Sequence, residues 1–276
     1  DLDGNGEFDF VIKKPSGSID PWWKYWRPST KTYKLEAYKD NGDFLWSYDM
    51  GWAIEHGIWY SPYVVYDVNG DGQAEVIVKS GEKDPRNEEG KVVSGPEYLT
   101  VLDGTTGKKI DQIDWVPREP FFDLHKDEGY NFASRNQIGI AYLDGVHPHV
   151  IVERGTYGLI IVRACRMMKD KLEMVWEWDN RNAPEKFWGQ GAHWLHAADV
   201  DDDDNDEVII GSAVLDNDGT ELWSTGLGHP DHVYVGDLIP DRPGLEIYYG
   251  IEKSCPNGNG MCMVKAEIGE IIWGVD

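Results

Sequence analysis

The chain has 276 residues, and its 50 acidic side chains against 26 lysines and arginines give a formal net charge of −24. A field of that sign repels phosphate backbones and anionic headgroups, so binding to nucleic acid or to a membrane surface is not expected. Apolar residues make up 41% and aromatic residues 12%, which is too rich for disorder, and no apolar run is long enough for a spanning helix. The sequence indicates a folded, acidic protein.

Its 31 glycines and 14 prolines, with 13 tryptophans and 14 tyrosines, are typical of short strands joined by tight turns. Three cysteines do not make a disulfide framework. A single bridge from Cys255 to Cys262 and three reduced thiols both remain open. Because the chain opens directly inside a motif at Asp1, we expect it to be part of a longer polypeptide.

An acidic motif recurs along the chain, and each copy leads into a strand. Complete copies occupy residues 1–9, 67–75 and 199–207, and degenerate copies lie at 142–144 and 236–238. The second half of each repeat is a strand, a polar turn and a strand, at residues 35–46, 99–110, 162–176, 213–223 and 264–273. The repeats occupy about residues 1–60, 61–135, 136–190, 191–229 and 230–276.

About four strands per repeat, five times over, predict an all-β fold of the β-propeller type, with residues 1–276 forming part of a single propeller domain. A solenoid of stacked β-units is the alternative.

The acidic motifs predict calcium loops, because they gather hard oxygen ligands at alternate positions with glycine where the backbone turns sharply. An EF-hand would need glutamate at loop position 12, which holds Ile12, Val78 and Ile210 instead. The third loop departs from the pattern, because Asp202 and Asp204 stand where the other loops have glycine. The candidate ligands are Asp1, Asp3, Asn5 and Asp9; Asp67, Asn69, Asp71 and Glu75; and Asp199, Asp201, Asp203 and Glu207.

A second group of polar residues follows in the last two repeats. His193 and His229 stand at equivalent places in Gly-rich loops, with Asp231 and Glu252 downstream of them. The symmetry of a propeller would bring both histidines to the same end of neighbouring blades. Two imidazoles and two carboxylates make a mixed nitrogen and oxygen metal site, whereas a histidine in a Gly-rich loop is by itself more often a surface residue.

The insertion at residues 20–27 carries four aromatic and two cationic side chains, including Trp22 and Trp23. Sugars stack on such rings and cations bind uronates, so a carbohydrate subsite is one interpretation. A satellite hydrophobic cluster is the other. Arg135, Arg154 and Tyr157 lie near strand ends, from which they could reach a cleft, although surface ion pairs would also explain the arginines.

Several motifs together resemble the bacterial rhamnogalacturonan lyase family, in the same order and over nearly the whole chain. They are WYSPYVVYDVNGDG at 59–72, SGPEYLTVLDG at 94–104, AYLDG at 141–145, WGQGAH at 188–193, STGLGH at 224–229 and DRPGLE at 241–246. The resemblance implies a secreted, calcium-dependent, eight-bladed propeller that cleaves the rhamnose and galacturonate backbone of pectin, so five repeats would be part of a ring.

The resemblance also implies site residues. His193, His229, Asp231 and Glu252 would hold a calcium ion in the active cleft, and the loops at Asp1, Asp67 and Asp199 would hold structural calcium ions. Apart from the resemblance, the position of Arg154 and Tyr157 near strand ends makes them candidate substrate contacts, with Trp22 and Trp23 of the insertion. The family's lysine and tyrosine from later blades would lie beyond Asp276, so the catalytic base is not assigned.

Two other functions compete with this one. A non-catalytic propeller, acting in adhesion, carbohydrate binding or as a scaffold, would need the calcium loops but not the two histidines and two acids. A lyase acting on another polymer of rhamnose and uronate, such as ulvan, is suggested by the Trp-rich insertion, which departs from the short polar loop of the family.

Overall fold

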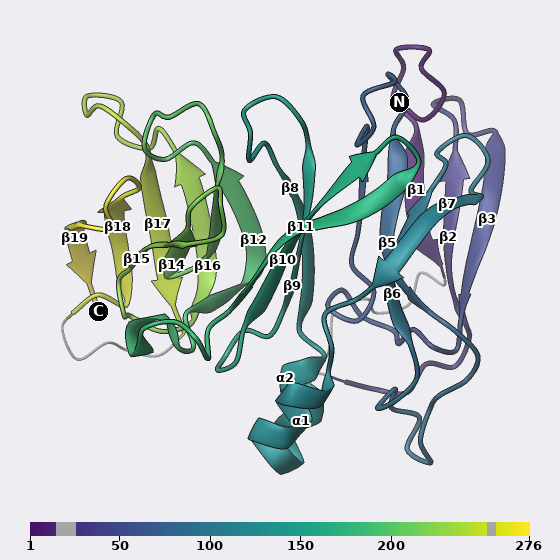
Figure 1. Ribbon diagram of the computed structural model, residues 1–276, viewed down its shortest axis with the longest axis horizontal. Coiled ribbons are helices and arrows are strands. Elements are labelled where there is room, and N and C mark those ends of the chain that lie inside the picture. The colour runs from purple at the N-terminus through teal and green to yellow at the C-terminus, as the bar shows by residue number, and fades with distance from the viewer. Residues whose placement is uncertain (15–25, 253–257) are drawn as a thin grey trace. The chain divides into compact units, whose positions relative to one another are not determined.

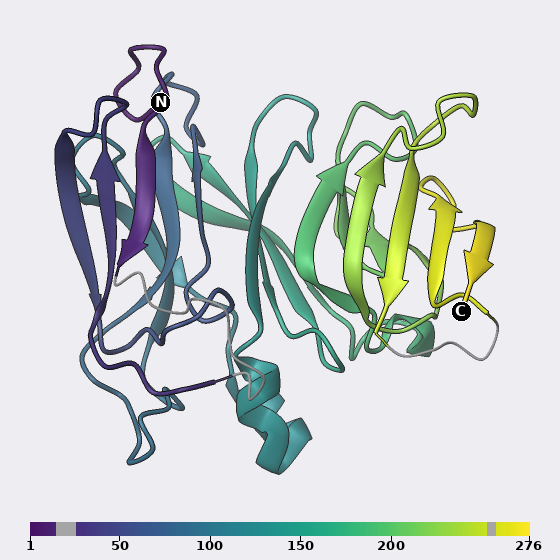
Figure 2. The ribbon, with the colours of Figure 1, turned by 180° about the vertical axis from the view of Figure 1, so that it is seen from behind.

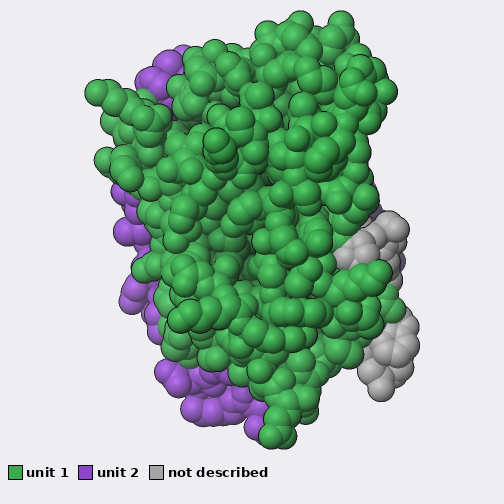
Figure 3. All heavy atoms as spheres, turned by 90° about the vertical axis from the view of Figure 1, so that its right-hand side faces the viewer, with its two compact units in different colours: residues 1–120, 166–173 green, residues 121–165, 174–276 purple. Residues whose placement is uncertain are grey.

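The computed structural model describes residues 1–14, 26–252 and 258–276. These residues form two compact units, shown in ribbon form in Figures 1 and 2 and coloured separately in Figure 3. Unit 1 comprises residues 1–120 and 166–173, and unit 2 comprises residues 121–165 and 174–276.

Two antiparallel sheets make up most of unit 1. The first has the order β1-β2-β3, and the second has the order β4-β5-β6-β7. Their strands are β1 (Phe10–Lys14), β2 (Tyr33–Tyr38), β3 (Phe44–Gly51), β4 (Tyr63–Tyr66), β5 (Glu75–Gly81), β6 (Glu97–Leu102) and β7 (Lys109–Asp114).

Unit 2 contains two complete four-stranded sheets and most of a third, whose hairpin tip at residues 166–173 is counted with unit 1. The strands are β8 (Asn136–Ala141), β9 (His149–Arg154), β10 (Ile161–Met168) and β11 (Lys171–Asp179); β12 (Gly191–Ala198), β13 (Glu207–Gly211), β14 (Ala213–Leu215) and β15 (Glu221–Ser224); and β16 (Pro230–Gly236), β17 (Glu246–Ile251), β18 (Met261–Lys265) and β19 (Ile271–Val275). Short helices are α1 (Glu119–His125) and α2 (Gly129–Ala133), with 3-10 turns at Lys126–Glu128 and Glu185–Phe187.

The predicted all-β class and the five repeated antiparallel sheets are confirmed. In the described residues the first sheet has three strands rather than four. Within unit 2 the first strands of the three sheets, β8, β12 and β16, are neighbours, which is the arrangement expected of propeller blades. Closure into a larger ring stays a prediction.

Hydrophobic alternation explains how the sheets pack. In β2, Tyr33, Leu35 and Ala37 are buried while the residues between them are partly exposed, because successive side chains of a strand point to opposite faces. These three residues pack against Val76 and Val78 of β5. In unit 2, similar clusters join the β8–β11 sheet to the β12–β15 sheet and the latter to the β16–β19 sheet.

A tryptophan clasp links successive sheets. The tryptophan lies in the last strand of one sheet, and its indole N–H donates to a backbone carbonyl in the turn between the third and fourth strands of the next sheet. A glycine of the same turn lies against the indole ring. Within the described ranges the clasps are Trp46 to Gly104 O at 2.7 Å, Trp176 to Asn217 O at 2.9 Å and Trp223 to Ala266 O at 2.8 Å, with Gly107, Gly219 and Gly269 as the covering glycines. In β7 the matching residue is Asp111, whose carboxylate accepts the Leu172 N–H at 2.9 Å.

The covering glycines should be intolerant of substitution. At Gly269 φ is +68°, and a Cβ atom would lie 2.5 Å from the Trp223 ring, so we expect Gly269→Ala to cost about 2–4 kcal/mol of unfolding free energy. Gly42 occupies the same place in the first sheet at φ +88°, but a Cβ there meets no described atom within 4 Å. Gly42→Ala should therefore cost only about 1 kcal/mol. Equal losses in denaturant titrations of the two variants would contradict the clasp.

Lys13 of β1 gives unit 1 a pH-dependent stability. Its Nζ atom lies 3.1 Å from Ser61 Oγ and over the rings of Tyr33 and Tyr63, and burial lowers its pKa to about 7. The unfolded lysine has a pKa near 10.4, so between about pH 7 and 10 the unfolded state binds more protons. The free energy of unfolding should therefore rise with pH across this window, and this gain should disappear as pH falls toward 7. Lys13→Met should abolish this slope in urea titrations, whereas an unchanged slope would exclude Lys13 as its source.

The described helices are all too short or too polar to cross a membrane.

Candidate metal centre

Two Gly-rich segments of unit 2 meet at one end of the neighbouring strands β12 and β16. His193 lies near the start of β12, and His229 directly precedes β16. The pairing of β12 with β13 is interrupted between Gly191 and His196, which releases His193 from the regular ladder. A Cβ atom on Gly211 opposite this bulge would lie 2.1 Å from the Gln190 carbonyl, so only glycine fits there.

Hydrogen bonds tie the second segment to the first. The Gly228 N–H donates to Gln190 Oε1 at 3.0 Å, and the Gly228 carbonyl accepts from Ser212 Oγ at 2.7 Å. His229 Nδ1 lies 2.5 Å from the Gly191 carbonyl and must donate to it, because a carbonyl can only accept. This contact fixes the tautomer of His229 and leaves the lone pair on its Nε2 atom.

The imidazoles of His193 and His229 stand edge to face, with ring centroids 4.6 Å apart. Asp231 Oδ1 lies 3.6 Å from His193 Nε2 and 3.5 Å from His229 Nε2. One ligand atom from each of the three residues falls within 4.8 Å of the others. His229 Nε2 is buried and makes no hydrogen bond within the described part of the chain. A buried lone pair facing a carboxylate and a second imidazole fits a divalent cation.

Both imidazoles are held neutral, which is the form that ligates metals. Burial, followed by the nearby His229, Arg135 and His232, lowers the pKa of His193 to about 3. Burial also lowers the pKa of His229, against the opposing effects of the Gly191 carbonyl and of the Glu252 and Asp231 carboxylates.

Tyr157 closes one side of this cluster. Its hydroxyl lies 3.4 Å from His193 Nε2, and its ring centroid is 4.6 Å from that of His229. The Arg135 guanidinium lies 5.4 Å from the Tyr157 ring centroid, and its Nη2 donates to Asn131 Oδ1 at 2.7 Å. Arg135 is 5% exposed, so it supports the tyrosine from within rather than reaching into a cleft.

The fourth expected ligand, Glu252, lies outside the cluster. Its N–H donates to the His229 carbonyl at 3.2 Å, and its charge acts on both His229 and Tyr157. Its carboxylate does not join the three ligand atoms within 4.8 Å of one another. Its role as a ligand stays a prediction.

The three acidic loops share one backbone conformation. Asp67 Oδ1 accepts from Gly70 N at 2.7 Å and Oδ2 accepts from Gly72 N at 2.8 Å, and Asp1 makes the same two contacts with Gly4 and Gly6. In the third loop Asp199 Oδ2 accepts from Asp204 N at 3.0 Å. The repeated sequence therefore folds in the same way each time.

Their acidic ligands are gathered to different degrees. Asp1, Asp3 and Asp9 form one close group, and Asp199, Asp201 and Asp203 form another. In the loop at residues 67–75, described throughout, no such group forms.

The first and third loops also hold buried carboxylate oxygens that have no hydrogen-bond partner among the described atoms. They are Asp3 Oδ1, Asp9 Oδ1 and Glu207 Oε1. Burial and then the neighbouring aspartates raise the pKa of Glu207 to about 8, a cost that a bound cation would offset.

The third loop carries backbone strain that the sequence anticipates. Asp202 and Asp204 have φ of +63° and +71°, where the other loops have glycine. We expect Asp202→Gly and Asp204→Gly each to stabilise the metal-free protein by about 0.5–1 kcal/mol. Asp218→Gly is the matched control, because Asp218 lies in an exposed turn at negative φ. In thermal unfolding with chelator, only Asp202→Gly and Asp204→Gly should raise the melting temperature. A lower melting temperature for these two variants would show that the aspartates are not strained.

The candidate substrate contacts differ in their access to solvent and to the cluster. Tyr157 lies beside the cluster, whereas Arg154 is 1% exposed and its Nε atom is fully buried. Arg154 therefore has no surface that a polymer could contact, because β9 is buried along its whole length.

Trp22 and Trp23 lie outside the described residues, as does Cys255 with its suggested bridge to Cys262. Trp26 of the same insertion donates to Glu55 Oε1 at 3.0 Å.

Sequence reasoning missed Gln190, which joins the two Gly-rich segments. Its side chain is 5% exposed and also donates to the Trp188 carbonyl at 2.9 Å, a role that depends on how the two segments pack.

Residues 1–276 match the model of a family described as rhamnogalacturonan lyase family 11, C-terminal domain. The chain belongs to this family. Two relatives from Bacillus subtilis (strain 168), the rhamnogalacturonan exolyase YesX and the rhamnogalacturonan endolyase YesW, are each 38% identical over 291 residues that include all of this chain. The match covers 47% of YesX and 46% of YesW, so the chain spans about half the length of these relatives.

Solved structures of the family give the same result. The crystal structure of YesW matches the whole chain with a TM-score of 0.92 at 39% identity and covers 49% of that protein. The rhamnogalacturonan lyase PL11 of Bacillus licheniformis matches with a TM-score of 0.92 at 36% identity and 49% coverage.

Proposed function

We propose that the complete protein is a secreted, calcium-dependent polysaccharide lyase that cleaves a rhamnogalacturonan-type polymer by β-elimination. The observation that carries this proposal is the family match over all 276 residues. The cluster of His193, His229 and Asp231 supports it, because a purely structural propeller has no use for two neutral imidazoles facing a carboxylate.

In the proposed reaction a base, to which no residue of this chain is assigned, takes the proton from C5 of a uronate while the bond from C4 to its oxygen breaks. The oxygen leaves as a hydroxyl group of the released fragment, and a C4–C5 double bond remains in the uronate. A calcium ion held by His193, His229 and Asp231 would neutralise the uronate carboxylate and stabilise the negative charge that develops as the proton leaves. Calcium favours six to eight oxygen ligands, so Glu252 is the further protein carboxylate we expect to contribute.

The residues of the chain prepare this site before substrate arrives. Burial keeps His193 and His229 neutral, and the Gly191 carbonyl holds the His229 ring in the orientation that presents Nε2. Tyr157, supported by Arg135 and by the Phe132 ring, would donate a hydrogen bond from its hydroxyl to an oxygen of the bound sugar.

We also propose that the acidic loops beginning at Asp1, Asp67 and Asp199 bind structural calcium ions. The buried unpartnered oxygens of Asp3, Asp9 and Glu207 support this for the first and third loops. The second loop shares their backbone but not their close grouping of acids, so we expect it to bind calcium most weakly.

The test is the ultraviolet absorbance of unsaturated uronate, measured with the complete protein on rhamnogalacturonan and on ulvan, with and without a calcium chelator. We expect a chelator-sensitive rise on rhamnogalacturonan. A rise in absorbance on ulvan alone would make ulvan the substrate in place of rhamnogalacturonan. No rise on either polymer, from folded and calcium-loaded protein, would favour the scaffold function. Product size over time separates exo from endo cleavage, which the equal identity to YesX and YesW does not.

A further inference from the structure

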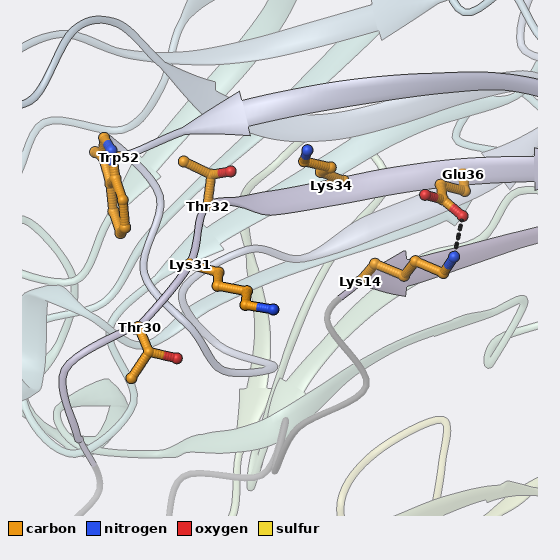
Figure 4. A pocket seen from close by; sticks show the side chains of 7 residues that line it. All are labelled: Lys14, Thr30, Lys31, Thr32, Lys34, Glu36 and Trp52. Carbon is orange, nitrogen blue, oxygen red and sulfur yellow. Dashed lines mark ion pairs between the residues drawn. The ribbon is translucent and has the colours of Figure 1, made fainter.

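A cationic groove in unit 1 has no place in the proposed metal centre, which is built from unit 2. It has a volume of about 480 Å³ and lies over the ends of β1 and β2 (Figure 4). Lys14, Lys31 and Lys34 line it together with Glu36, Trp52 and two threonines. A groove of this size is within the range of sites that hold small ligands.

The charge of the groove is opposite to that of the chain. Lys14 Nζ pairs with Glu36 Oε2 at 2.7 Å, and Lys34 Nζ pairs with Asp49 Oδ2 at 3.3 Å. Lys31 is exposed and makes no ion pair or hydrogen bond with any described residue. Three lysines against two carboxylates leave one surplus positive charge, in a chain where acids outnumber bases 50 to 26. An ammonium group without a partner attracts an anion.

Trp52 supplies an aromatic surface beside these amines. The Arg86 guanidinium lies 3.8 Å from the ring centroid of Trp52, and two hydrogen bonds to Asp84 hold Arg86 in place. The indole is therefore braced by a fixed cation, while it also lines the groove. In Figure 4 Trp52 stands beside Thr32, and the Lys31 side chain extends into the space between Thr30 and Lys14.

We infer that this groove binds a uronate residue of an acidic polysaccharide. The carboxylate pairs with Lys31, the apolar face of the sugar ring packs on Trp52, and Thr30 and Thr32 bond to hydroxyl groups. Because Lys14 and Lys34 already have partners, Lys31 carries most of the discrimination between an acidic and a neutral sugar. The inference rests on the proposed function in one respect: that function supplies a uronate polymer as the natural ligand.

Lysine labelling tests this directly on the complete protein. An acetylating N-hydroxysuccinimide ester is applied with and without a short oligogalacturonate, and mass spectrometry follows each lysine. At ten times the dissociation constant, the oligogalacturonate should slow the labelling of Lys31 about tenfold. Lys108, an exposed lysine in the β6–β7 turn of the same unit, is the matched control and should label equally in both samples.

Variants and other probes sharpen the test. Lys31→Ser should weaken oligogalacturonate binding about fivefold by calorimetry, whereas Lys108→Ser should not change it. A carboxyl-reduced oligosaccharide should give no protection. Equal labelling of Lys31 with and without ligand would overturn the inference. So would a Lys31 that is unreactive in the free protein, or protection by inorganic phosphate without protection by oligogalacturonate.

Parallel lyase assays separate this inference from the proposed function. Protein that cleaves rhamnogalacturonan while Lys31 stays unprotected overturns the groove alone. Protein that protects Lys31 but cleaves neither rhamnogalacturonan nor ulvan overturns the lyase function and leaves the groove as a binding site.

Discussion

Replacing His229 with alanine is expected to lower the lyase rate of the complete protein at least about 100-fold. The substitution removes the buried Nε2 lone pair that faces Asp231 and also the contact with the Gly191 carbonyl. His193→Ala should have a similar effect, because its Nε2 atom faces the same carboxylate oxygen. The assay is the absorbance of unsaturated uronate, with metal content measured on the same samples.

His147→Ala is the control for this prediction. His147 is an exposed histidine of unit 2 whose Nδ1 atom lies 2.8 Å from Asp144, outside the cluster. It should keep both full activity and full metal content. If His229→Ala retained activity and metal together, the metal centre would have to be placed elsewhere.

Removing calcium is expected to destabilise the protein as well as inactivate it. A site held at 1,000 times its dissociation constant adds about 4 kcal/mol to the unfolding free energy, so chelation should lower the melting temperature of a chain of this length by about 7 °C for each strong site. We expect the loops with closely grouped acids, at Asp1 and Asp199, to account for most of this loss.

Variants of single loops show which loop binds the calcium ion that raises the melting temperature. Asp199→Asn should remove the contribution of the third loop, so that calcium shifts the melting temperature less than in the parent protein. Asp218→Asn, an exposed aspartate outside the loops, should leave the shift unchanged. A calcium shift of the same size in both variants would mean that the third loop binds no structural ion.

The repeats and the turns could be predicted from the sequence because they depend on local rules. Asp202 and Asp204 stand at glycine positions of the repeated loop, and both adopt the positive φ that this alignment requires. Likewise, His193 and His229 hold equivalent places in successive repeats, and the structure brings them together.

Features that depend on packing between repeats could not be predicted in this way. The position of Arg154 near a strand end suggested access to a cleft, but the burial of β9 along its whole length is a property of the assembled sheets. The same holds for the tryptophan clasps, whose partners lie 41 to 58 residues away in the chain. The groove lysines come from segments on either side of a long insertion, so their spacing gave no signal.

We propose that His193, His229 and Asp231 hold a calcium ion that cleavage requires. Crystals of the complete protein, grown with calcium, provide the most direct measurement through anomalous scattering. We expect a peak bounded by the two Nε2 atoms and the Asp231 carboxylate, present in the parent protein and absent from His229→Ala. An empty cluster in calcium-saturated protein that cleaves rhamnogalacturonan would contradict the claim.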